Sequence, residues 1–318
     1  MIKVNIGIDV GGMSIKAGLV DDLGNIIYRD KVKSNSLIGN DLLVSLLITL
    51  CDKLFLYASE NNLQICGIGI GVPGTVNNKK MSLDYAPNLK VKNLSLKDAL
   101  EKYKIPVYIS NDANCAALAE QKFGIAKQYS DVILLTLGTG IGGGVVINNQ
   151  LFEGFEGKGA ELGHMVLKLG GKKCGCGRKG CFEAYASASA LLRYTKEEMR
   201  HNKNSLMWEY CEGNINNVSG LTSFECAKKD DESANKVVDK YIMYLGEGIL
   251  NYCNIFRPEA IVLGGGVSSQ KDYLINKVEK YVADRNYGLM NSRKVDILVA
   301  TLGNDAGIIG AAHLLKIE

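Results

Sequence analysis

The chain has 318 residues, of which 47% are hydrophobic, and its 37 Lys and Arg nearly balance its 34 Asp and Glu. This length suits two domains of ordinary size, and a net charge of +3 over so large a surface argues against a nucleic-acid partner. The N-terminus lacks the regions of a signal peptide, and the longest uncharged run, residues 132–150, is interrupted by glycines and polar residues. We therefore expect a soluble cytoplasmic protein without a membrane span.

The first half of the chain alternates between strand and helix patterns. Residues 4–34 have apolar residues at every second position on both sides of two turns, which predicts three antiparallel strands. Residues 41–62 have helical spacing with Asn40 or Asp41 as the N-cap, and residues 65–74 form a short apolar strand that ends in a Pro-Gly turn. Residues 105–124 predict a buried strand that leads into a helix, whose first turn contains Asn111 and Asp112.

The second half begins with the same unit. Residues 131–154 predict a strand, a glycine turn, a second strand and an Asn-Asn turn, whereas residues 194–231 are polar and irregular with local helices. A long half-buried helix at 232–256, a strand that runs into glycines at 257–268 and a small-residue helix at 305–318 follow. Because each half opens with a hairpin that carries a glycine turn, we expect two similar α/β domains. The predicted bounds are 1–117, joined by the helix 305–318, and 118–304 with the cysteine loop.

The glycine turns narrow the choice of ligand. Residues 138–143 match the dinucleotide fingerprint G-x-G-x-x-G, but a β-branched segment follows where that fingerprint needs a helix. The sequence also contains no G-x-x-x-x-G-K-[ST] motif. The remaining interpretations are an ordinary hairpin or a phosphate-binding hairpin, in which glycine lets backbone N–H groups approach phosphate oxygens. Asp9, beside Gly11 and Gly12, adds a carboxylate suited to Mg²⁺, bound through water.

Asp112 stands between a strand and a helix, in the stretch SNDAN. Asp and Asn are favoured at helix starts, so a simple cap explains this residue. The alternative is a catalytic base that accepts the proton of a hydroxyl attacking a γ-phosphate. A helix N-terminus stabilises the anionic form that a base needs. Both interpretations remain open on the residues alone.

A cluster of soft ligands lies between two carboxylates. His164 and Cys174, Cys176 and Cys181 offer the donor set of a tetrahedral structural zinc site, and a loose thiol cluster is the alternative. A filled site has no open position for catalysis, so it would hold Glu161 and Glu183 rigidly for a polyhydroxylated ligand. We expect His201 and His313 to be structural. The remaining cysteines have apolar neighbours and are predicted to fill the core: Cys51, Cys66, Cys115, Cys211, Cys226 and Cys253.

These motifs together resemble the ROK family of bacterial sugar kinases and sugar-responsive repressors, within the actin/hexokinase/Hsp70 superfamily. The resemblance covers nearly the whole chain: IGIDVGGMSIKAGLV resembles the first phosphate hairpin, LGTGIGGGVV the second, and LGGGVS the adenosine segment. ELGH followed by CGCGRKGCFE is highly specific to the family. The resemblance implies an α/β fold of two actin-like (ribonuclease H-like) ATPase domains around a central cleft, which closes over the substrate.

The resemblance also implies roles for single residues. Asp112 would be the catalytic base, and His164 would give one ring nitrogen to zinc and the other to the sugar. The implied sugar-binding residues are Asn88, Asn111, Asp112, Glu161, His164 and Glu183, and the implied ligands of a structural Zn²⁺ are His164, Cys174, Cys176 and Cys181. The implied binding residues for ATP and Mg²⁺ are Asp9, Gly11, Gly12, Ser14, Lys16, Thr139, Gly140, Gly142, Gly264, Gly265 and Gly266.

Three functions compete. The first is an ATP-dependent hexokinase with glucose as the leading substrate. N-acetylmannosamine, fructose, mannose and allose stay open, because kinases for these sugars would share the same acids and zinc loop. Val91 and Lys158 also depart from the family pattern, which bears on the choice of sugar more than on the choice of reaction. The second is a sugar-sensing repressor, whose N-terminal helix-turn-helix has no room before the first hairpin. The third is an ATPase with a protein partner, which the ELGH motif and the cysteine loop disfavour. We expect sugar and ATP as small-molecule partners, no nucleic acid, no membrane, and a homodimer.

Overall fold

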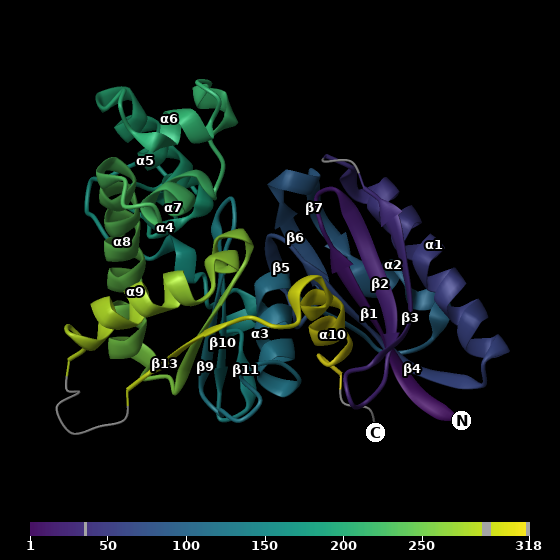
Figure 1. Ribbon diagram of the computed structural model, residues 1–318. Helices are drawn as coiled ribbons and strands as arrows, with labels where there is room; N and C mark the ends of the chain where they lie inside the picture. Colours follow the sequence, from purple (N-terminus) through teal and green to yellow (C-terminus); the bar gives the residue numbers. More distant parts are fainter. Residues whose placement is uncertain (35–36, 288–293, 316–318) are drawn as a thin grey trace. The chain divides into compact units, whose positions relative to one another are not determined.

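A computed structural model describes residues 1–34, 37–287 and 294–315, and the chain divides into two compact units (Figure 1). Unit 1 comprises Met1–Ser130, Gly144–Ala160 and Thr301–Glu318, and unit 2 comprises Asp131–Gly143 and Glu161–Ala300. The predicted boundary at residue 117 falls inside a helix, and residues 144–160 belong to unit 1 instead of the second domain. The predicted return of the C-terminal helix to the first unit agrees with this division, although residues 316–318 lie outside the described residues.

Unit 1 is built on a five-stranded sheet with the order β3-β2-β1-β4-β8. The first three strands along the chain pair antiparallel, as their alternating pattern predicts, whereas β4 and β8 add to β1 in parallel. The parallel strands therefore end at the same edge of the sheet. The bounds are β1 (Ile2–Val10), β2 (Ser14–Val20), β3 (Ile26–Lys33), β4 (Leu63–Val72) and β8 (Val107–Asn111).

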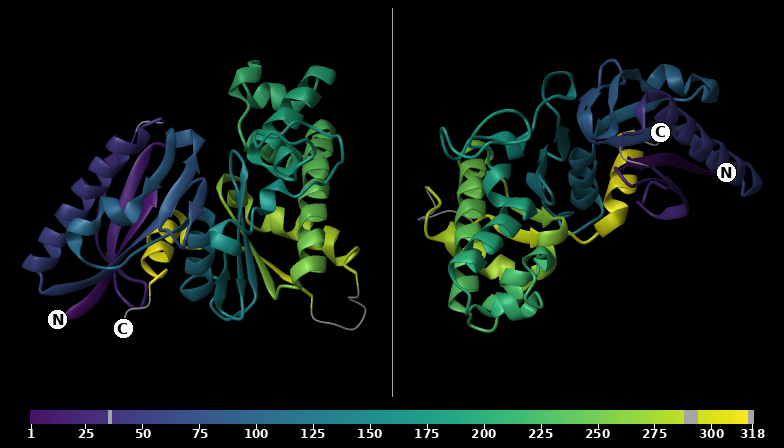
Figure 2. Two further views of the ribbon diagram at one scale, coloured as in Figure 1. Left: turned by 180° about the vertical axis from the view of Figure 1, so that it is seen from behind. Right: turned by 90° about the horizontal axis from the view of Figure 1, so that it is seen from above.

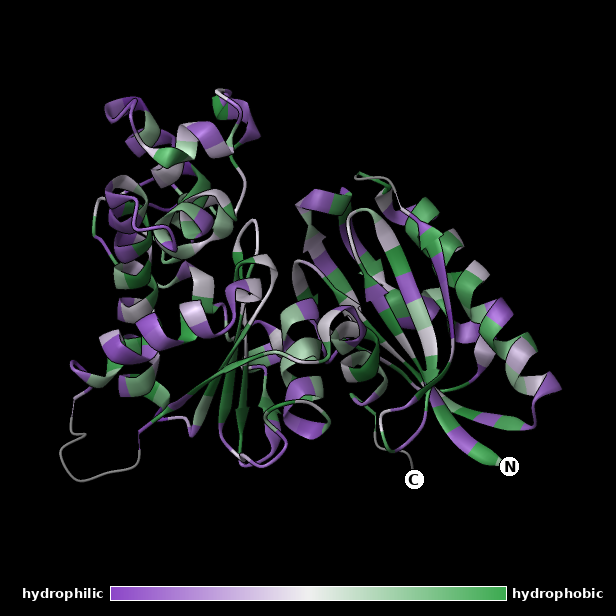
Figure 3. Ribbon diagram, in the orientation of Figure 1, coloured by the Kyte–Doolittle hydropathy of each residue, from purple (hydrophilic) through white to green (hydrophobic). Residues whose placement is uncertain are grey.

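Helix α1 (Gly39–Glu60) covers one face of this sheet. By length and composition it could cross a membrane, which the sequence analysis did not anticipate, and it is the one such helix in the part of the chain that the structure describes. Its hydrophobic and hydrophilic residues are interleaved (Figure 3), and the buried ones recur at helical spacing within the core of unit 1. One face of α1 therefore packs on the core of unit 1. Its buried residues are Leu43, Leu47, Leu50, Cys51, Leu54 and Ala58.

The start of α1 corrects a second expectation. The N-cap is Ile38 and makes no side-chain capping bond, so neither Asn40 nor Asp41 caps the helix. The side chain of Asn40 instead bonds the backbone of Lys92, with its Nδ2 2.9 Å from the carbonyl oxygen and its Oδ1 3.2 Å from the amide nitrogen. A contact far away in sequence has taken the side chain that local preference assigned to the cap.

The opposite face of the sheet carries α3 (Asp112–Lys122) and α10 (Ala306–Ala312). Both views of Figure 2 show α10 beside the N-terminal strands. A Cβ at Gly7 or Gly69 would lie 2.0 or 1.8 Å from a carbonyl oxygen of α10, and a Cβ at Gly310 would lie 1.8 Å from the carbonyl oxygen of Cys115. Glycine at these positions lets α10 approach both the sheet and α3 at backbone distance.

A small antiparallel sheet with the order β5-β6-β7 completes unit 1. Its strands are β5 (Thr75–Asn77), β6 (Ser82–Ala86) and β7 (Val91–Ser95), and they precede α2 (Leu96–Ala99). The short 3₁₀ turn Pro87–Leu89 connects β6 to β7 and carries Asn88. Lys158 forms an ion pair with this sheet, with its Nζ 2.9 Å from Oδ2 of Asp84 in β6.

The second sheet has the order β11-β10-β9-β12-β13, in which β9, β12 and β13 are parallel. The predicted strands, glycine turn and Asn-Asn turn are confirmed, and the latter has positive φ at Asn148 and Asn149. The strands are β9 (Val132–Leu137), β10 (Ile141–Ile147), β11 (Gln150–Phe152), β12 (Ala260–Gly264) and β13 (Asp296–Val299).

The helices of unit 2 include the predicted long helix and the local helices before it. Their bounds are α4 (Glu183–Ala186), α5 (Ala188–His201), α6 (Leu206–Tyr210), α7 (Thr222–Ala227), α8 (Glu232–Phe256) and α9 (Asp272–Ala283). All nine cysteines are free thiols. Five of the six cysteines predicted to fill the core are buried, but Cys66 is only partly buried, so that prediction is wrong for Cys66.

Candidate active site

The first glycine turn joins β1 to β2 in unit 1. Gly11 closes the turn by donating its N–H to the Ser14 carbonyl oxygen at 3.0 Å. Asp9 and Lys16 lie opposite each other across the two strands, with Lys16 Nζ 3.6 Å from Asp9 Oδ2. Burial raises the pKa of Asp9, and the charge of Lys16 opposes this shift. A half-buried carboxylate with a single counter-ion at 3.6 Å is a site that a further cation would stabilise.

Asp112 lies at the edge of the same sheet. It is the first residue of α3 and its side chain is exposed, whereas Asn111, predicted to lie in the first turn of the helix, is its N-cap and accepts from the Ala113 N–H at 2.9 Å. Asp9 pairs with Gly71 of β4, and Gly71 pairs with Ser110 of β8. Because these three strands are parallel, Asp9 and Asp112 both lie at the carboxyl ends of the strands.

Cys115 lies in α3, three residues after Asp112. It is fully buried, and burial together with the charges of Asp112, Glu153 and Asp9 holds its pKa well above the ordinary value. The thiol therefore stays neutral and adds no negative charge to this acidic edge. Asn88 is exposed in the turn between β6 and β7, where its backbone oxygen accepts from Leu37.

The second glycine turn joins β9 to β10 in unit 2. The Gly142 N–H donates to Thr136 Oγ1 at 3.1 Å, and the turn rests on the start of α5, where Ser189 Oγ donates to the Thr139 oxygen at 2.8 Å. Gly264 pairs with Thr136 across β12 and β9. Gly265 follows with a φ of 82°, in the region that favours glycine. The segment Gly264–Gly266 and the turn Thr139–Gly142 therefore lie at neighbouring strand ends.

The predicted metal ligands are brought together in unit 2. One donor atom from each of His164, Cys174, Cys176 and Cys181 lies within 4.8 Å of all the others. The Sγ atoms of Cys176 and Cys181 are 3.7 Å apart, and Cys174 Sγ is 3.6 Å from His164 Nδ1. Two sulfurs bound to tetrahedral zinc at about 2.3 Å would lie about 3.8 Å apart, so the donor set fits Zn²⁺.

Glu183 connects this cluster to the second glycine turn. Its Oε1 is 3.4 Å from Cys174 Sγ, and its Oε2 accepts from the Ile141 N–H at 3.0 Å. A Cβ at Gly140 would lie 2.2 Å from that same Oε2, so glycine leaves the space that the carboxylate occupies. Partial desolvation raises the pKa of Glu161, with the charge of His164 opposing the shift and that of Glu183 adding to it. His164 and Glu183 therefore lie close enough to Glu161 for their charges to affect its pKa.

Comparison with known proteins agrees with this arrangement. The model of the ROK family matches residues 5–318. This chain belongs to the ROK family. A glucokinase of Halalkalibacterium halodurans is 35% identical over 98% of this chain and 94% of its own length, and a xylose repressor of Bacillus subtilis is 30% identical over 98% of this chain and 76% of its own.

The fold of this chain is also similar to that of a solved ROK structure. The ROK glucokinase of Streptomyces griseus, in complex with glucose and AMPPNP, is 33% identical with a TM-score of 0.80, and the match covers 98% of each chain. The expected two-domain actin-like ATPase fold is thereby confirmed.

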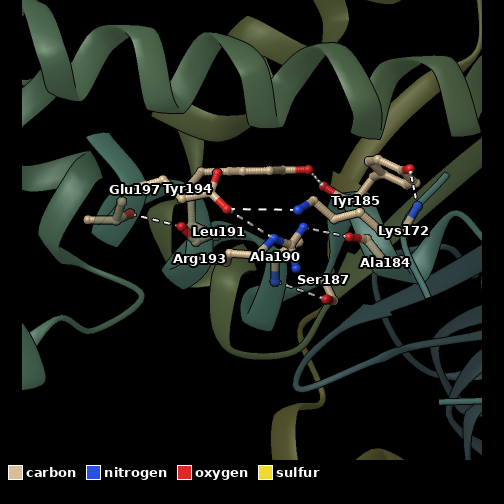
Figure 4. A network of polar contacts seen from close by, with 10 residues as sticks. Lys172, Ala184, Tyr185, Ser187, Ala190, Leu191, Arg193, Tyr194 and Glu197 are labelled. Carbon is tan, nitrogen blue, oxygen red and sulfur yellow. Dashed lines mark hydrogen bonds and ion pairs between the residues drawn. The ribbon is translucent and has the colours of Figure 1, made fainter. Parts of the chain in front are cut away.

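A polar network holds the helix that begins with Glu183 in this ROK protein (Figure 4). From α5, Arg193 Nη2 donates to the Ala184 oxygen at 2.7 Å, and the Tyr194 hydroxyl donates to the Tyr185 oxygen at 3.0 Å. The Tyr185 hydroxyl in turn accepts from the Lys172 N–H at 2.7 Å, in the segment before the cysteines. The two middle residues of α4 are thus attached, which limits the positions that Glu183 can take.

The sequence did not indicate a role for two acids, the buried Glu120 and the half-buried Glu153. Glu120 is fully buried, and its Oε1 accepts the backbone N–H groups of Thr301 and Leu302 at 2.8 and 2.7 Å, which attaches α3 to the segment before α10. Glu153 accepts from the hydroxyl of Ser110, two residues before Asp112. Neither acid belongs to a motif, and each has partners far away in sequence, so no local signal could have identified them.

Proposed function

We propose that this protein transfers the γ-phosphoryl group of ATP to the 6-hydroxyl of a hexose, with glucose as the leading substrate. The observation that carries the proposal is the exposed carboxylate of Asp112 at the first turn of α3, at the sheet edge that also carries Asp9. The similarity to glucokinases over nearly the whole chain supports this reaction.

Asp112 is proposed to act as the base. Its carboxylate would accept the proton of the sugar hydroxyl while that oxygen attacks the γ-phosphorus and the bond to the β-phosphate oxygen breaks. The helix N-terminus favours the anionic form, and the attached Asn111 cap holds the start of the helix in place. Since the transition state is loose, orientation of the hydroxyl by Asp112 contributes as much as its basicity.

The remaining polar residues would bind the sugar. Charged acceptors select hydroxyl donors, and an imidazole with one nitrogen turned toward the cysteines has its Nε2 left for a hydroxyl. We propose Asn88, Asn111, Glu161, His164 and Glu183 as the residues that bind the sugar, together with Asp112.

The nucleotide would be bound by the two glycine turns and the glycine segment after β12. Backbone N–H groups in such turns bind phosphate oxygens, and Asp9 with Lys16 would face the phosphates and Mg²⁺. Bound Mg²⁺ supplies charge neutralisation at the β- and γ-phosphates. The proposed residues in these segments are Asp9, Gly11, Gly12, Ser14, Lys16, Thr139, Gly140, Gly142, Gly264, Gly265 and Gly266.

We propose a structural Zn²⁺ on His164, Cys174, Cys176 and Cys181. Burial raises the pKa of Cys174 to about 12, so this thiol needs a bound cation to become a thiolate at neutral pH. With four protein ligands the ion would have no open position, and its part would be to hold the loop beside Glu183. A cytoplasmic location and a homodimer are further parts of this proposal.

The experiment measures ADP release with Mg-ATP and glucose, mannose, fructose, allose, N-acetylglucosamine or N-acetylmannosamine. We expect strong stimulation by one sugar, and at least about a hundredfold loss of kcat in Asp112→Asn. Asp98→Asn is the matched control, because Asp98 is also an exposed carboxylate in the first turn of a helix of unit 1. Sugar binding without ADP release would favour the alternative, a non-catalytic sugar sensor similar to the xylose repressors.

A further inference from the structure

Glu153 joins two segments of unit 1 that are far apart in sequence. It follows β11, and its Oε1 accepts from the hydroxyl of Ser110 at the end of β8. Its Oε2 accepts from Asn78 Nδ2 at 3.1 Å, in the turn after β5. The two carboxylate oxygens therefore have one donor each, and both donors come from other elements of the unit.

These contacts continue into the first turn of α3. The buried Asn114 donates from Nδ2 to Ser110 Oγ at 3.4 Å, so the serine hydroxyl donates to Glu153 and accepts from the helix. Ser110 precedes Asp112 by two residues, and Asn114 follows it by two. The chain Asn114–Ser110–Glu153 thus attaches the backbone on both sides of Asp112 to one carboxylate.

Two more hydrogen bonds attach residues next to this chain of contacts. Asn111 Nδ2 donates to the Gly74 oxygen at 3.4 Å, and the Asn78 N–H donates to the Glu156 oxygen at 3.1 Å. The loop that carries Glu153 is itself attached to β6 through the ion pair of Lys158 with Asp84 at 2.9 Å. Glu153 is therefore a fixed acceptor instead of the end of a mobile loop.

We propose that Glu153 is a positioning residue for Asp112, which acts by holding the junction of β8 and α3. It is not in contact with the substrate in this proposal, which rests on the proposed kinase function. The consequence is that removal of the charged acceptor lowers the rate through the orientation of Asp112 and not through nucleotide binding.

Glu153→Gln tests the proposal with little change in volume. A glutamine has one acceptor oxygen, so its NH₂ group must face either Ser110 or Asn78, and both donate to the native carboxylate. We expect kcat to fall about tenfold, with an unchanged KM for ATP, because a displaced catalytic group loses orientation. Glu156→Gln is the control: it neutralises an acid in the same loop whose side chain bonds Lys158 at 3.1 Å.

A double-mutant cycle separates positioning from general damage. If Glu153 acts through Asp112, Glu153→Gln should change kcat less than about twofold in the Asp112→Asn background. A similar tenfold loss in both backgrounds, or an unchanged kcat in the single variant, would overturn the proposal.

Hydrogen–deuterium exchange gives a readout independent of turnover. Amides of residues 107–118 should exchange faster in Glu153→Gln than in both the native protein and Glu156→Gln, at equal global stability by thermal unfolding. Unchanged exchange would overturn the positioning role even if the enzyme is active. If the native protein phosphorylates no sugar, the proposed function fails, whereas the exchange experiment still decides whether Glu153 holds this junction.

Discussion

Gly140→Ala is a sharp test of how Glu183 is held. The new Cβ would lie 2.2 Å from Glu183 Oε2, and non-bonded carbon and oxygen atoms do not approach so closely. The carboxylate must retreat by about 1 Å, which also lengthens its bond with the Ile141 N–H, now 3.0 Å, beyond hydrogen-bonding range. A displacement of about 1 Å at a substrate-orienting group costs about a hundredfold in rate, which is about 2.8 kcal/mol of transition-state stabilisation.

The same change should affect stability much less. The lost hydrogen bond to a charged group is worth about 1.5–3 kcal/mol, and alanine returns about 0.4–1 kcal/mol by restricting the unfolded chain. A net loss of about 1–2 kcal/mol lowers Tm by about 2–3 °C in a protein of this size. The measurements are kcat and KM for sugar and ATP, together with thermal unfolding.

Gly138→Ala is the matched control within the same turn. Its new Cβ would have its nearest neighbour, the Gly140 oxygen, 4.0 Å away, and neither glycine has a positive φ that alanine would strain. The reasoning predicts that only the variant at Gly140 loses kcat/KM for the sugar. Equal losses in both variants would refute it, because the turn itself and not the space for Glu183 would then determine activity.

Two further predictions concern metal and pH. Cys176→Ser, or a strong chelator, should remove one zinc per chain as measured by elemental analysis, and should lower Tm because the cluster supports the loop beside α4; a native protein purified without metal would contradict this. Asp9→Asn should abolish turnover yet raise Tm at pH 7, because burial raises the pKa of Asp9 and the charged form therefore destabilises the folded state at neutral pH. This gain in Tm should disappear as the pH falls below the ordinary value of 3.8, where Asp9 is protonated in both states; a gain that is independent of pH would contradict the assignment.

Local patterns predicted most of the elements that carry the site. The period-two alternation of β1 to β3 and the Asn-Asn turn at 148–149 depend on neighbours in sequence, and the structure has both. The helix predicted around Asn111 and Asp112 is also present, but its cap is Asn111 and not Asp112. The cysteine cluster was also predictable, because the spacing of a metal site is itself a local signal.

What the sequence could not predict depends on distant partners. Asn40 is a good helix cap by preference but bonds Lys92, 52 residues away. Glu120 bonds Thr301, 181 residues away, and Glu153 bonds Ser110, 43 residues away. Each of these side chains has a local interpretation that is reasonable alone, and only the folded chain shows which partner it binds. The domain boundary has the same cause, since residues 144–160 follow strands of unit 2 yet pack within unit 1.

The two groups of proposed catalytic residues are held by different chemistry. Asp112 is attached through hydrogen bonds of Ser110 and Asn114, which need no metal, whereas Glu183 is attached to Cys174 and the second glycine turn. Removal of the proposed metal should therefore disturb the proposed sugar contact of Glu183 before it disturbs Asp112, the proposed base. Exchange measured on a metal-free sample should accordingly increase at 161–186 and stay unchanged at 107–118, since each network lies within its own unit.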